Sequence, residues 1–391
     1  MVKYAYGFQK NTMKILFVQK MAGISGSELY LLQIMPELRR RGFDVEMLII
    51  YPAKTNNNER FVSYLADHGI QTHEIYGHRT LSPFLFYKFY QLLSKRKFHL
   101  IQSNLVHADV LVSLTKLIFA PTLKFVSVKH GYDPGYQAKY GFDLKWVKCG
   151  LFYWVEKFAS RQANFNITIS KGLYRVFTER GIISSSRIQN IYYGLTLREP
   201  VEKNQSLKVP DGPYALIIGR LVGFKGHKYL IDSWKKVRAK VPELKLYISG
   251  NGELYEELNI LIQNSGLNDD VYLLGHTPNP HPLIKNSLFT IVTSTWEGFG
   301  LILLESWLHK KAIIAFDVPA MNEVIDDGID GLLVPFKDTD TLAKKIIWMY
   351  KHQKEAKQMG ERGFEKFNSY YTLQRMTDET ESVYKKVLSN L

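Results

Sequence analysis

Short apolar runs rich in β-branched residues alternate along the whole chain with longer amphipathic segments. The short runs have strand length, and the segments between them repeat apolar residues at helical spacing, as Leu230, Trp234, Val237 and Val241 do. This alternation predicts parallel sheets covered by helices on both faces, an α/β class of fold. The expected strands lie near residues 14–19, 44–50, 71–76, 100–103, 124–129, 165–169, 188–192, 214–218, 245–249, 271–274, 288–293, 312–316 and 331–334.

Thirteen strands are too many for one ordinary open sheet. Residues 198–212 are polar, contain Pro200 and Pro210 and show no periodicity, which is typical of a linker. We therefore expect two Rossmann-like domains, residues 1–200 and 201–391, with the last helix free to cross back to the first domain. Ligands of open parallel sheets bind beyond the carboxyl ends of the strands, so two facing domains would hold a two-part ligand in the cleft between them.

Composition adds a charge asymmetry to this picture. The 391 residues are 46% hydrophobic and 23% charged, which is ordinary globular usage. Lysine and arginine total 51 against 37 acidic residues, and the net charge is +14. Residues 1–200 hold 27 basic and 13 acidic residues, whereas the rest of the chain is balanced at 24 of each. The first half is therefore expected to meet an anionic partner: nucleic acid, an acidic membrane or a phosphorylated substrate.

Cysteine usage and hydropathy indicate a location. The single cysteine, Cys149, excludes an internal disulfide and a cysteine-rich zinc site and favours a reducing compartment. No apolar run is long enough to span a bilayer, and the first one, residues 15–18, is too short for a signal peptide. Residues 1–12 are interpreted as a polar extension before Met13, which is itself a candidate start. We expect a cytoplasmic protein.

The strongest chemical signal is the segment STWEGFGLILLESW, where an expected strand runs through a glycine-containing loop into an apolar helix. Gly298 and Gly300 allow the backbone to turn and approach a ligand, and the free N–H groups of the helix start favour a diphosphate. Glu305 lies about 7.5 Å along the helix axis from Gly300, where it could accept hydrogen bonds from both hydroxyls of a ribose. Glu297 lies on the loop. The plain alternative is a surface-loop acid and a solvated helix acid, but an acid inside so apolar a helix argues against it.

A second signal is the segment IIGRLVGFKGHKYLI. An expected strand ends at Gly219, and Arg220 and Lys225 flank a loop before a helix that begins near His227. A planar guanidinium and an ammonium at the carboxyl end of one strand suit a diphosphate. Ordinary surface-loop charges are the alternative. The loop is not a Walker A motif, because the Gly-Lys-Ser/Thr ending is missing.

These two segments carry a resemblance to the retaining family-four glycosyltransferases of the GT-B fold. The family has the motif Gly-Arg-Leu followed by Lys-Gly, which residues 219–226 match. It also has two glutamates separated by seven residues, which Glu297 and Glu305 match. Weaker matches are YISGNGELYEEL, VYLLGH and VIDDGIDGLLVP in the second half and SGSELYLLQIMPELRRRGFDV and VKHGYDP in the first. The resemblance spans nearly the whole chain from Met13.

The resemblance implies a role for each matched residue. Arg220 and Lys225 would neutralise the donor diphosphate, Glu305 would hold the ribose, and Glu297 would hold hydroxyls of the donor sugar. His130 would contact the sugar from the first domain, and Gly26 would approach the phosphates. The expected catalytic residues are His130, Arg220, Lys225 and Glu297; the expected donor-binding residues are Gly26, Gly219, Arg220, Lys225, Gly250, Gly275, His276, Glu297, Gly298, Phe299, Gly300, Leu301 and Glu305.

The chain also departs from the family pattern. Ser25 stands where the first of two glycines is usual, so the backbone approach there is tighter. Tyr193 and Thr196 stand where the family often has Asn and Asp, so we assign no hinge-side contacts. The one Asp-x-Asp sequence, Asp338 to Asp340, is interpreted as a helix N-cap rather than a metal site. We therefore expect no metal and no cofactor.

The function implied is transfer of a sugar, with retention, from a nucleotide-diphosphate sugar to a glycan or lipid-linked acceptor. UDP is preferred over GDP on family frequency. One alternative is a sugar-nucleotide epimerase or phosphorylase on the same scaffold. An NAD-dependent oxidoreductase is a second, but this chain lacks the full glycine fingerprint that such an enzyme has after its first strand. A nucleic-acid binder is a third, and the position of Arg220 and Lys225 in the uncharged half argues against it.

The basic first half is expected to hold the acceptor and to make a peripheral contact with an anionic membrane. Its densest basic clusters are Arg39-Arg40-Arg41 and Lys95-Arg96-Lys97, each after an amphipathic stretch. The aromatic run 84–93 could touch a membrane surface or could be an amphipathic helix packed on its own sheet.

Overall fold

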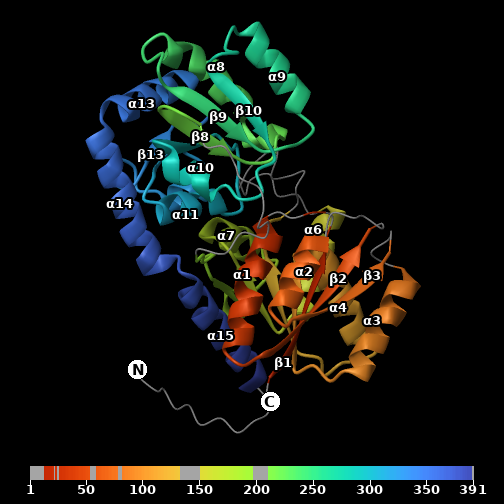
Figure 1. The fold of residues 1–391 in the computed structure, drawn as a ribbon. Helices are drawn as coiled ribbons and strands as arrows, with labels where there is room; N and C mark the ends of the chain where they lie inside the picture. Colours follow the sequence, from red (N-terminus) through yellow and green to blue (C-terminus); the bar gives the residue numbers. More distant parts are fainter. Residues whose placement is uncertain are drawn as a thin grey trace.

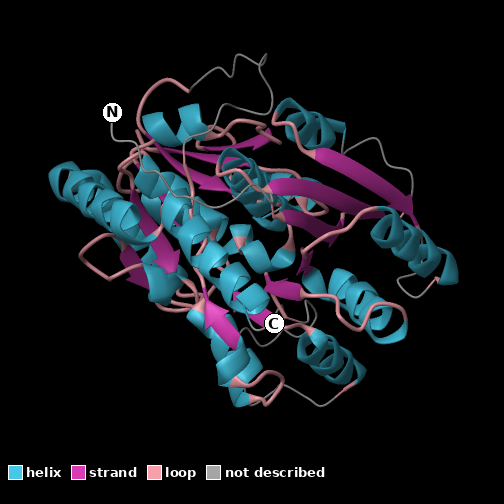
Figure 2. Ribbon diagram, turned by 90° about the horizontal axis from the view of Figure 1, so that it is seen from below, coloured by secondary structure: helices cyan, strands magenta, loops and turns pink. Residues whose placement is uncertain are grey.

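The computed structural model describes residues 13–21, 23, 26–52, 59–77, 82–132, 150–196 and 210–389. Two sheets, each covered by helices on both faces, form two domains stacked one above the other (Figure 1). Seen from below, strands lie between layers of helices (Figure 2). None of the helices in the described ranges is long and apolar enough to cross a membrane.

The first sheet contains β1 (Lys14–Lys20), β2 (Asp44–Tyr51), β3 (Gln71–Tyr76), β4 (Leu100–Asn104), β5 (Phe125–Lys129), β6 (Phe165–Thr168) and β7 (Ile188–Asn190). All neighbours are parallel, in the order β3-β2-β1-β4-β5-β6-β7, so the chain order reverses between β1 and β4. The central strands are buried because helices cover both faces. These helices are α1 (Gly26–Arg40), α2 (Glu59–Asp67), α3 (Pro83–Lys95), α4 (Leu105–Ile118), α6 (Leu151–Gln162) and α7 (Lys171–Glu179).

The second sheet contains β8 (Tyr214–Ile218), β9 (Lys245–Ser249), β10 (Val271–Gly275), β11 (Phe289–Val292), β12 (Ala312–Phe316) and β13 (Leu332–Val334). Its parallel order is β10-β9-β8-β11-β12-β13, and the reversal falls between β8 and β11. All thirteen predicted strands are therefore present, with ends that differ by at most two residues. The helices are α8 (His227–Arg238), α9 (Tyr255–Asn264), α10 (His281–Asn286), α11 (Leu301–Leu308), α12 (Met321–Val324), α13 (Thr339–Lys351), α14 (Gln353–Tyr370) and α15 (Leu373–Ser389).

The predicted apolar stripe of α8 faces the core. Leu230, Trp234 and Val237 are completely buried, and Val241, just beyond the helix, is 2% exposed. Burying one such side chain stabilises a fold by about 1.5–3 kcal/mol. The helical spacing of these residues is thus explained by packing on the second sheet.

The chain crosses between the domains twice, at adjacent places. Most of the expected linker, residues 198–212, lies outside the described residues. The segment just before it pairs with the start of α15: Leu195 N donates to Tyr371 O at 3.0 Å, and Leu373 N to Leu195 O at 3.1 Å. At Gly194 a Cβ atom would lie 2.1 Å from the oxygen of Thr372, so no larger residue fits between the two crossings. These segments form the hinge.

The last helix returns to the first domain, as the descending blue helices of Figure 1 show. There α15 packs against α1, and Arg41 Nη1 donates to Asp378 Oδ1 at 2.5 Å and to Glu381 Oε1 at 2.7 Å. Deeper in the interface, the hydroxyl of Tyr384 donates to Gln102 Oε1. The C-terminal helix is therefore part of the first domain's core.

Candidate active site

The carboxyl ends of β8 and β11 form one wall of the candidate site, at the point where strand order reverses. The loop after β8 ends at Gly226, which has φ +69° and is the N-cap of α8. A Cβ atom at Gly226 would lie 2.0 Å from the oxygen of Thr293, just after β11. Glycine is required here both for its left-handed conformation and for this close approach, which holds the two loops together.

Lys225 and Glu297 bridge these two loops. Lys225 Nζ pairs with Glu297 Oε1, and Ser294 Oγ donates to the same carboxylate oxygen at 2.8 Å. Arg220 is exposed, and its guanidinium lies 5.8 Å from the ring centre of Phe224, whose ring also has Lys225 Nζ at 5.6 Å. Arg220 and Lys225 therefore both lie near the ring of Phe224 at the strand ends. Lys225 is also paired with the carboxylate of Glu297, which is 9% exposed.

The loop from Glu297 to Leu301 reaches across to the first domain. A Cβ atom at Gly298 would lie 2.7 Å from the main-chain oxygen of His130, and one at Gly26 would lie 3.8 Å from Leu301 Cδ1. Gly300, with φ +86°, starts α11, and its own Cβ would lie 2.6 Å from Met321 Cε. The predicted residues of the two domains thus meet across the interface.

The remaining donor-side residues line up along the strand ends. Gly219 N donates to Ser249 O at 3.0 Å, and Gly250 N donates to Gly275 O at 2.8 Å, so β8, β9 and β10 end side by side. A Cβ atom at Gly250 would lie 1.9 Å from the oxygen of Gly219. His276 follows as an exposed residue, and Glu305 is half-buried on α11.

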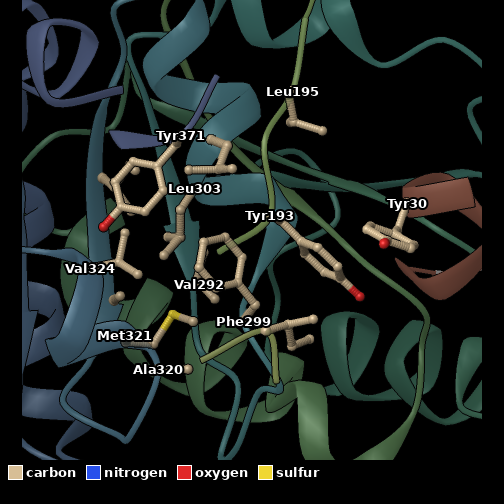
Figure 3. Packing of buried hydrophobic residues seen from close by; sticks show 14 of the residues in the cluster. Tyr30, Tyr193, Leu195, Val292, Phe299, Leu303, Ala320, Met321, Val324 and Tyr371 are labelled. Carbon is tan, nitrogen blue, oxygen red and sulfur yellow. The ribbon is translucent and has the colours of Figure 1, made fainter. Parts of the chain in front are cut away.

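The side chain of Phe299 is buried between aromatic rings, although its position in a loop did not indicate burial. It is 1% exposed, and its ring lies 5.4 Å from that of Tyr193 and 5.9 Å from that of Tyr371. Figure 3 shows Tyr193 lying between Phe299 and Tyr30. Only the backbone of Phe299 therefore remains to serve a ligand, because the ring belongs to the apolar contact between the domains.

His130 follows β5 and is held by two neighbours. Its Nδ1 lies 2.5 Å from Tyr193 Oη, and its Nε2 lies 3.0 Å from Asn104 Oδ1. Burial, together with the nearby charge of Lys129, lowers the pKa of His130 to about 3. The imidazole is therefore neutral near pH 7.

Beneath His130 lies a buried cluster of charges. Lys129 Nζ is 2.5 Å from both Asp109 Oδ2 and Glu156 Oε1, and all three side chains are at most 3% exposed. Burial opposes the lysine's charge, but the two carboxylates outweigh it and raise the pKa of Lys129. The sequence signal for this cluster is the lysine at the end of the apolar run FVSVK, a residue that needs buried acidic partners.

The expected N-cap of α13 is confirmed. Asp338 Oδ1 accepts from the backbone N–H groups of Asp340 and Thr341 at 3.0 and 2.9 Å, and these bonds lower the pKa of Asp338. Within the described ranges, no three His, Cys, Asp or Glu side chains are grouped to hold a metal ion. Ser25 and Cys149 lie outside the described residues.

Two family models match the chain almost end to end. Residues 24–199 match Glycosyltransferase Family 4, and residues 199–366 match Glycosyl transferases group 1. Similar solved structures include Anabaena HepE in complex with UDP and glucose, with a TM-score of 0.78, 21% identity, and coverage of 96% of this chain and 100% of that one. A mutant of S. aureus TarM, in complex with Fondaparinux, alpha-GlcNAc-glycerol and UDP, has a TM-score of 0.72 at 12% identity, covering 96% and 100%.

Curated relatives match over shorter stretches. Poly(glycerol-phosphate) alpha-glucosyltransferase of Bacillus subtilis is 30% identical over 42% of this chain and 25% of its own length. Poly(ribitol-phosphate) alpha-N-acetylglucosaminyltransferase of Staphylococcus aureus is 27% identical over 44% and 34%. The chain thus matches only about a quarter to a third of the length of these two relatives. With two parallel-sheet domains facing one site, the expected fold is confirmed, and the chain belongs to the group 1, family-four glycosyltransferases of the GT-B fold.

Proposed function

We propose that this protein transfers a sugar, with retention, from a UDP-sugar to a glycan or lipid-linked acceptor at the cytoplasmic face of a membrane. The observation that carries the proposal is the pair of cations, Arg220 and Lys225, at the strand ends beside Glu297, opposite His130 and Gly26. This is the arrangement that a diphosphate leaving group and a sugar require at neighbouring places.

The chemistry follows from these charges. As the bond between the sugar's anomeric carbon and the diphosphate breaks, negative charge grows on the diphosphate. Arg220 and Lys225 stabilise that charge, and Lys225 has three N–H donors, so it can hold a phosphate oxygen without releasing Glu297. The acceptor oxygen bonds to the same face of the sugar, and its proton passes to the departing diphosphate oxygen. No protein carboxylate is needed as nucleophile, and we propose that no metal is needed.

UDP is the proposed nucleotide. The similar structures of HepE were solved with UDP, with UDP-glucose, and with UDP and glucose, and that of a pneumococcal O-GlcNAc transferase with UDP and GlcNAc. Glu305, on the helix behind the glycine loop, is proposed to hold the ribose hydroxyls, with His276 and Gly275 on the base side.

An anionic polymer or lipid-linked glycan is the proposed acceptor. The relatives named above act on poly(glycerol-phosphate) and poly(ribitol-phosphate), and a further one, from Campylobacter jejuni, on a diphospho-undecaprenol-linked sugar. The excess of 14 positive charges in residues 1–200 suits such acceptors.

The basic cluster Arg39-Arg40-Arg41 offers little charge to a membrane. Arg39 pairs with Asp44 at 2.9 Å, Arg40 with Glu37 at 2.7 Å, and Arg41 with Glu37, Asp378 and Glu381. We therefore propose that membrane contact is made by another surface and not by this cluster.

That surface is the α3–α4 face: Phe84, Tyr87 and Tyr90 of α3 with Leu117, Ile118 and Phe119 at the end of α4, each at least 39% exposed. Only Leu85 and Phe89 of α3 are buried on the sheet. The rings of Tyr90 and Phe119 lie 4.9 Å apart and join the two helices. The sequence left membrane contact and an amphipathic helix packed on its own sheet as alternatives. The helix does pack on its sheet, and its exposed aromatic side chains support the proposed membrane contact.

The charge around this face suits an anionic bilayer. Residues 82–132 carry seven lysines and arginines and one acidic residue, Asp109, which is buried against Lys129. Lys88, Lys95 and Lys97 are exposed, and Lys88 Nζ lies 5.5 Å from the ring centre of Phe84. Aromatic residues and lysines together favour the interface of an acidic membrane, where each cation contributes about 1 kcal/mol.

Binding of nucleotides tests the donor assignment. Thermal unfolding is measured with UDP, GDP, ADP and their glucose conjugates, for the wild type and for Lys225→Met. A UDP-specific rise in Tm that the variant loses is expected, since a ligand at 100 times its Kd adds about 2.7 kcal/mol. Equal shifts with every nucleotide, or none, would contradict a UDP site at Lys225.

Vesicle co-sedimentation tests the membrane contact. Salt-sensitive binding to anionic but not to neutral vesicles is expected, and Tyr87→Ser with Phe119→Ser should abolish it. The control is Ile260→Ser, which removes a side chain of similar exposure, 53%, from α9 of the other domain. Two results would exclude the α3–α4 face: equal loss of vesicle binding in the double variant and in Ile260→Ser, or no vesicle binding by the wild type at low salt. Neither result would affect the donor site.

A further inference from the structure

Both ring nitrogens of His130 are occupied by protein groups. The hydroxyl of Tyr193 lies 2.5 Å from Nδ1, and the amide oxygen of Asn104 lies 3.0 Å from Nε2. Asn104 is the last residue of β4, next to β5, while Tyr193 comes from the segment that leads to the hinge. Asn104 is completely buried and Tyr193 is 4% exposed, whereas His130 itself is only partly buried.

These partners select one tautomer. An amide oxygen can only accept, so Nε2 carries the proton and donates it to Asn104. Nδ1 is then the acceptor, and Tyr193 donates to it. Burial raises the pKa of the Tyr193 hydroxyl well above its ordinary value, so this donor keeps its proton.

Tyr193 also connects the two halves of the active site. Its ring lies 5.5 Å from that of Tyr30 on α1 and 5.4 Å, nearly perpendicular, from that of Phe299. Phe299 is next to Gly298, whose α-carbon lies against the main-chain oxygen of His130. One side chain therefore contacts the His130 ring in the first domain and, through Phe299, the glutamate-bearing loop of the second. Figure 3 shows the contact between Tyr193 and Phe299.

We propose that Tyr193 is a positioning residue for sugar transfer: its hydroxyl fixes the tautomer and the ring orientation of His130, and its ring sets the distance between His130 and the Glu297–Leu301 loop. The inference rests on the proposed transferase function. Tyr193 acts through His130, so its hydroxyl matters for turnover more than for nucleotide binding. A tyrosine that only fills the domain interface would need its ring and not its hydroxyl.

NMR of the free protein tests the hydrogen bond without any activity. Long-range ¹H–¹⁵N spectra of protein labelled at histidine give the Nδ1 and Nε2 resonances, and His130→Ala identifies the pair that belongs to His130. We expect a neutral ring protonated at Nε2, and in Tyr193→Phe a displaced Nδ1 resonance with Nε2 nearly unchanged. Tyr192→Phe is the matched control, because the neighbouring ring also packs near Phe299 but its hydroxyl bonds to Glu323 instead. A proton on Nδ1, or an unchanged Nδ1 resonance in Tyr193→Phe, would overturn the inference.

A double-mutant cycle tests the consequence for transfer. Tyr193→Phe should lower kcat by about three- to tenfold, the range of one lost hydrogen bond, and leave the Kd of UDP within twofold. In the His130→Ala background the same change should have no further effect on kcat, because the residue acts through the imidazole. Additive losses in the two backgrounds, or a raised Kd for UDP with unchanged kcat, would contradict a positioning role. If no nucleotide sugar is turned over at all, the proposed function fails, while the NMR result still decides the hydrogen bond.

Discussion

Gly298 lies so close to His130 that a methyl group on its α-carbon would come within 2.7 Å of the histidine's main-chain oxygen. The two residues belong to different domains, so this contact shows how closely the two domains approach each other at the candidate site. Gly298→Ala forces backbone to move, and we expect kcat to fall at least tenfold. The effect on the Kd of UDP should be smaller, because the added methyl group does not meet the proposed contacts of UDP with Arg220, Lys225 and Glu305. Gly223→Ala is the control, since its added methyl group meets nothing within 4 Å. Wild-type kcat in Gly298→Ala would show that this close approach is not needed for transfer.

The cations of the β8 loop should carry most of the rate enhancement. Arg220→Ala and Lys225→Met each remove one positive charge from the diphosphate side, and a loss of kcat of about 10²–10³ is expected for each. Circular dichroism and Tm check that both variants stay folded. If both retain near-normal kcat, the diphosphate is bound elsewhere.

Glu305 is expected to hold the nucleotide rather than the sugar. Glu305→Ala should raise the Kd of UDP about ten- to hundredfold, since a hydrogen bond to a charged group contributes about 1.5–3 kcal/mol. Titration calorimetry gives the constant, with Glu355→Ala, an exposed acid of α14, as the control. An unchanged Kd would remove Glu305 from the site.

His227, the first residue of α8, makes the fold sensitive to acid. It is 2% exposed, and burial together with the charge of Lys225 lowers its pKa from 6.5 to about 4. Between these pH values the unfolded chain takes up a proton that the folded protein does not, so the free energy of unfolding decreases as the pH falls from 6.5 to 4. Urea unfolding of His227→Gln should show a slope against pH smaller by about 1.4 kcal/mol per unit. Parallel slopes for the two proteins would mean that His227 is protonated in the fold.

Transfer is predicted to proceed without a metal ion. Asp338 and Asp340 are used at a helix start, where Asp338 accepts backbone hydrogen bonds. Activity should therefore persist in excess EDTA. A complete loss that added Mg²⁺ or Mn²⁺ restores would require a metal in the mechanism.

The strands and the glycine turns at their ends could be predicted from sequence because both depend on local pattern. Apolar runs of strand length mark buried parallel strands, and glycines after β8 and β11 mark tight turns at their ends. Lys225 and Glu297 could be placed at the same edge of one sheet. Their ion pair could not be predicted, because 72 residues separate them and their side-chain geometry depends on both loops.

Other features depend on tertiary neighbours that a sequence does not reveal. Arg41 was counted as free positive charge, but its partners Asp378 and Glu381 lie 337 and 340 residues away on a helix that crosses between domains. Tyr193 was noted only as a departure from the family pattern. Its hydrogen bond to His130, 63 residues earlier, could not be predicted, because it depends on where the hinge segment lies relative to the end of β5.

Acceptor-dependent release of nucleoside diphosphate tests the central claim most directly. Purified protein is incubated with labelled UDP-glucose or UDP-N-acetylglucosamine, with and without poly(glycerol-phosphate), poly(ribitol-phosphate) or a polyprenyl-diphosphate-linked sugar, and the free UDP and the label in the acceptor are both measured. The account predicts that UDP appears in step with label in one of these acceptors, that the new linkage has the anomeric configuration of the donor, and that Lys225→Met lowers both signals by about 10²–10³. Conversion of the donor to an epimer without UDP release, or transfer that Lys225→Met leaves intact, would contradict it.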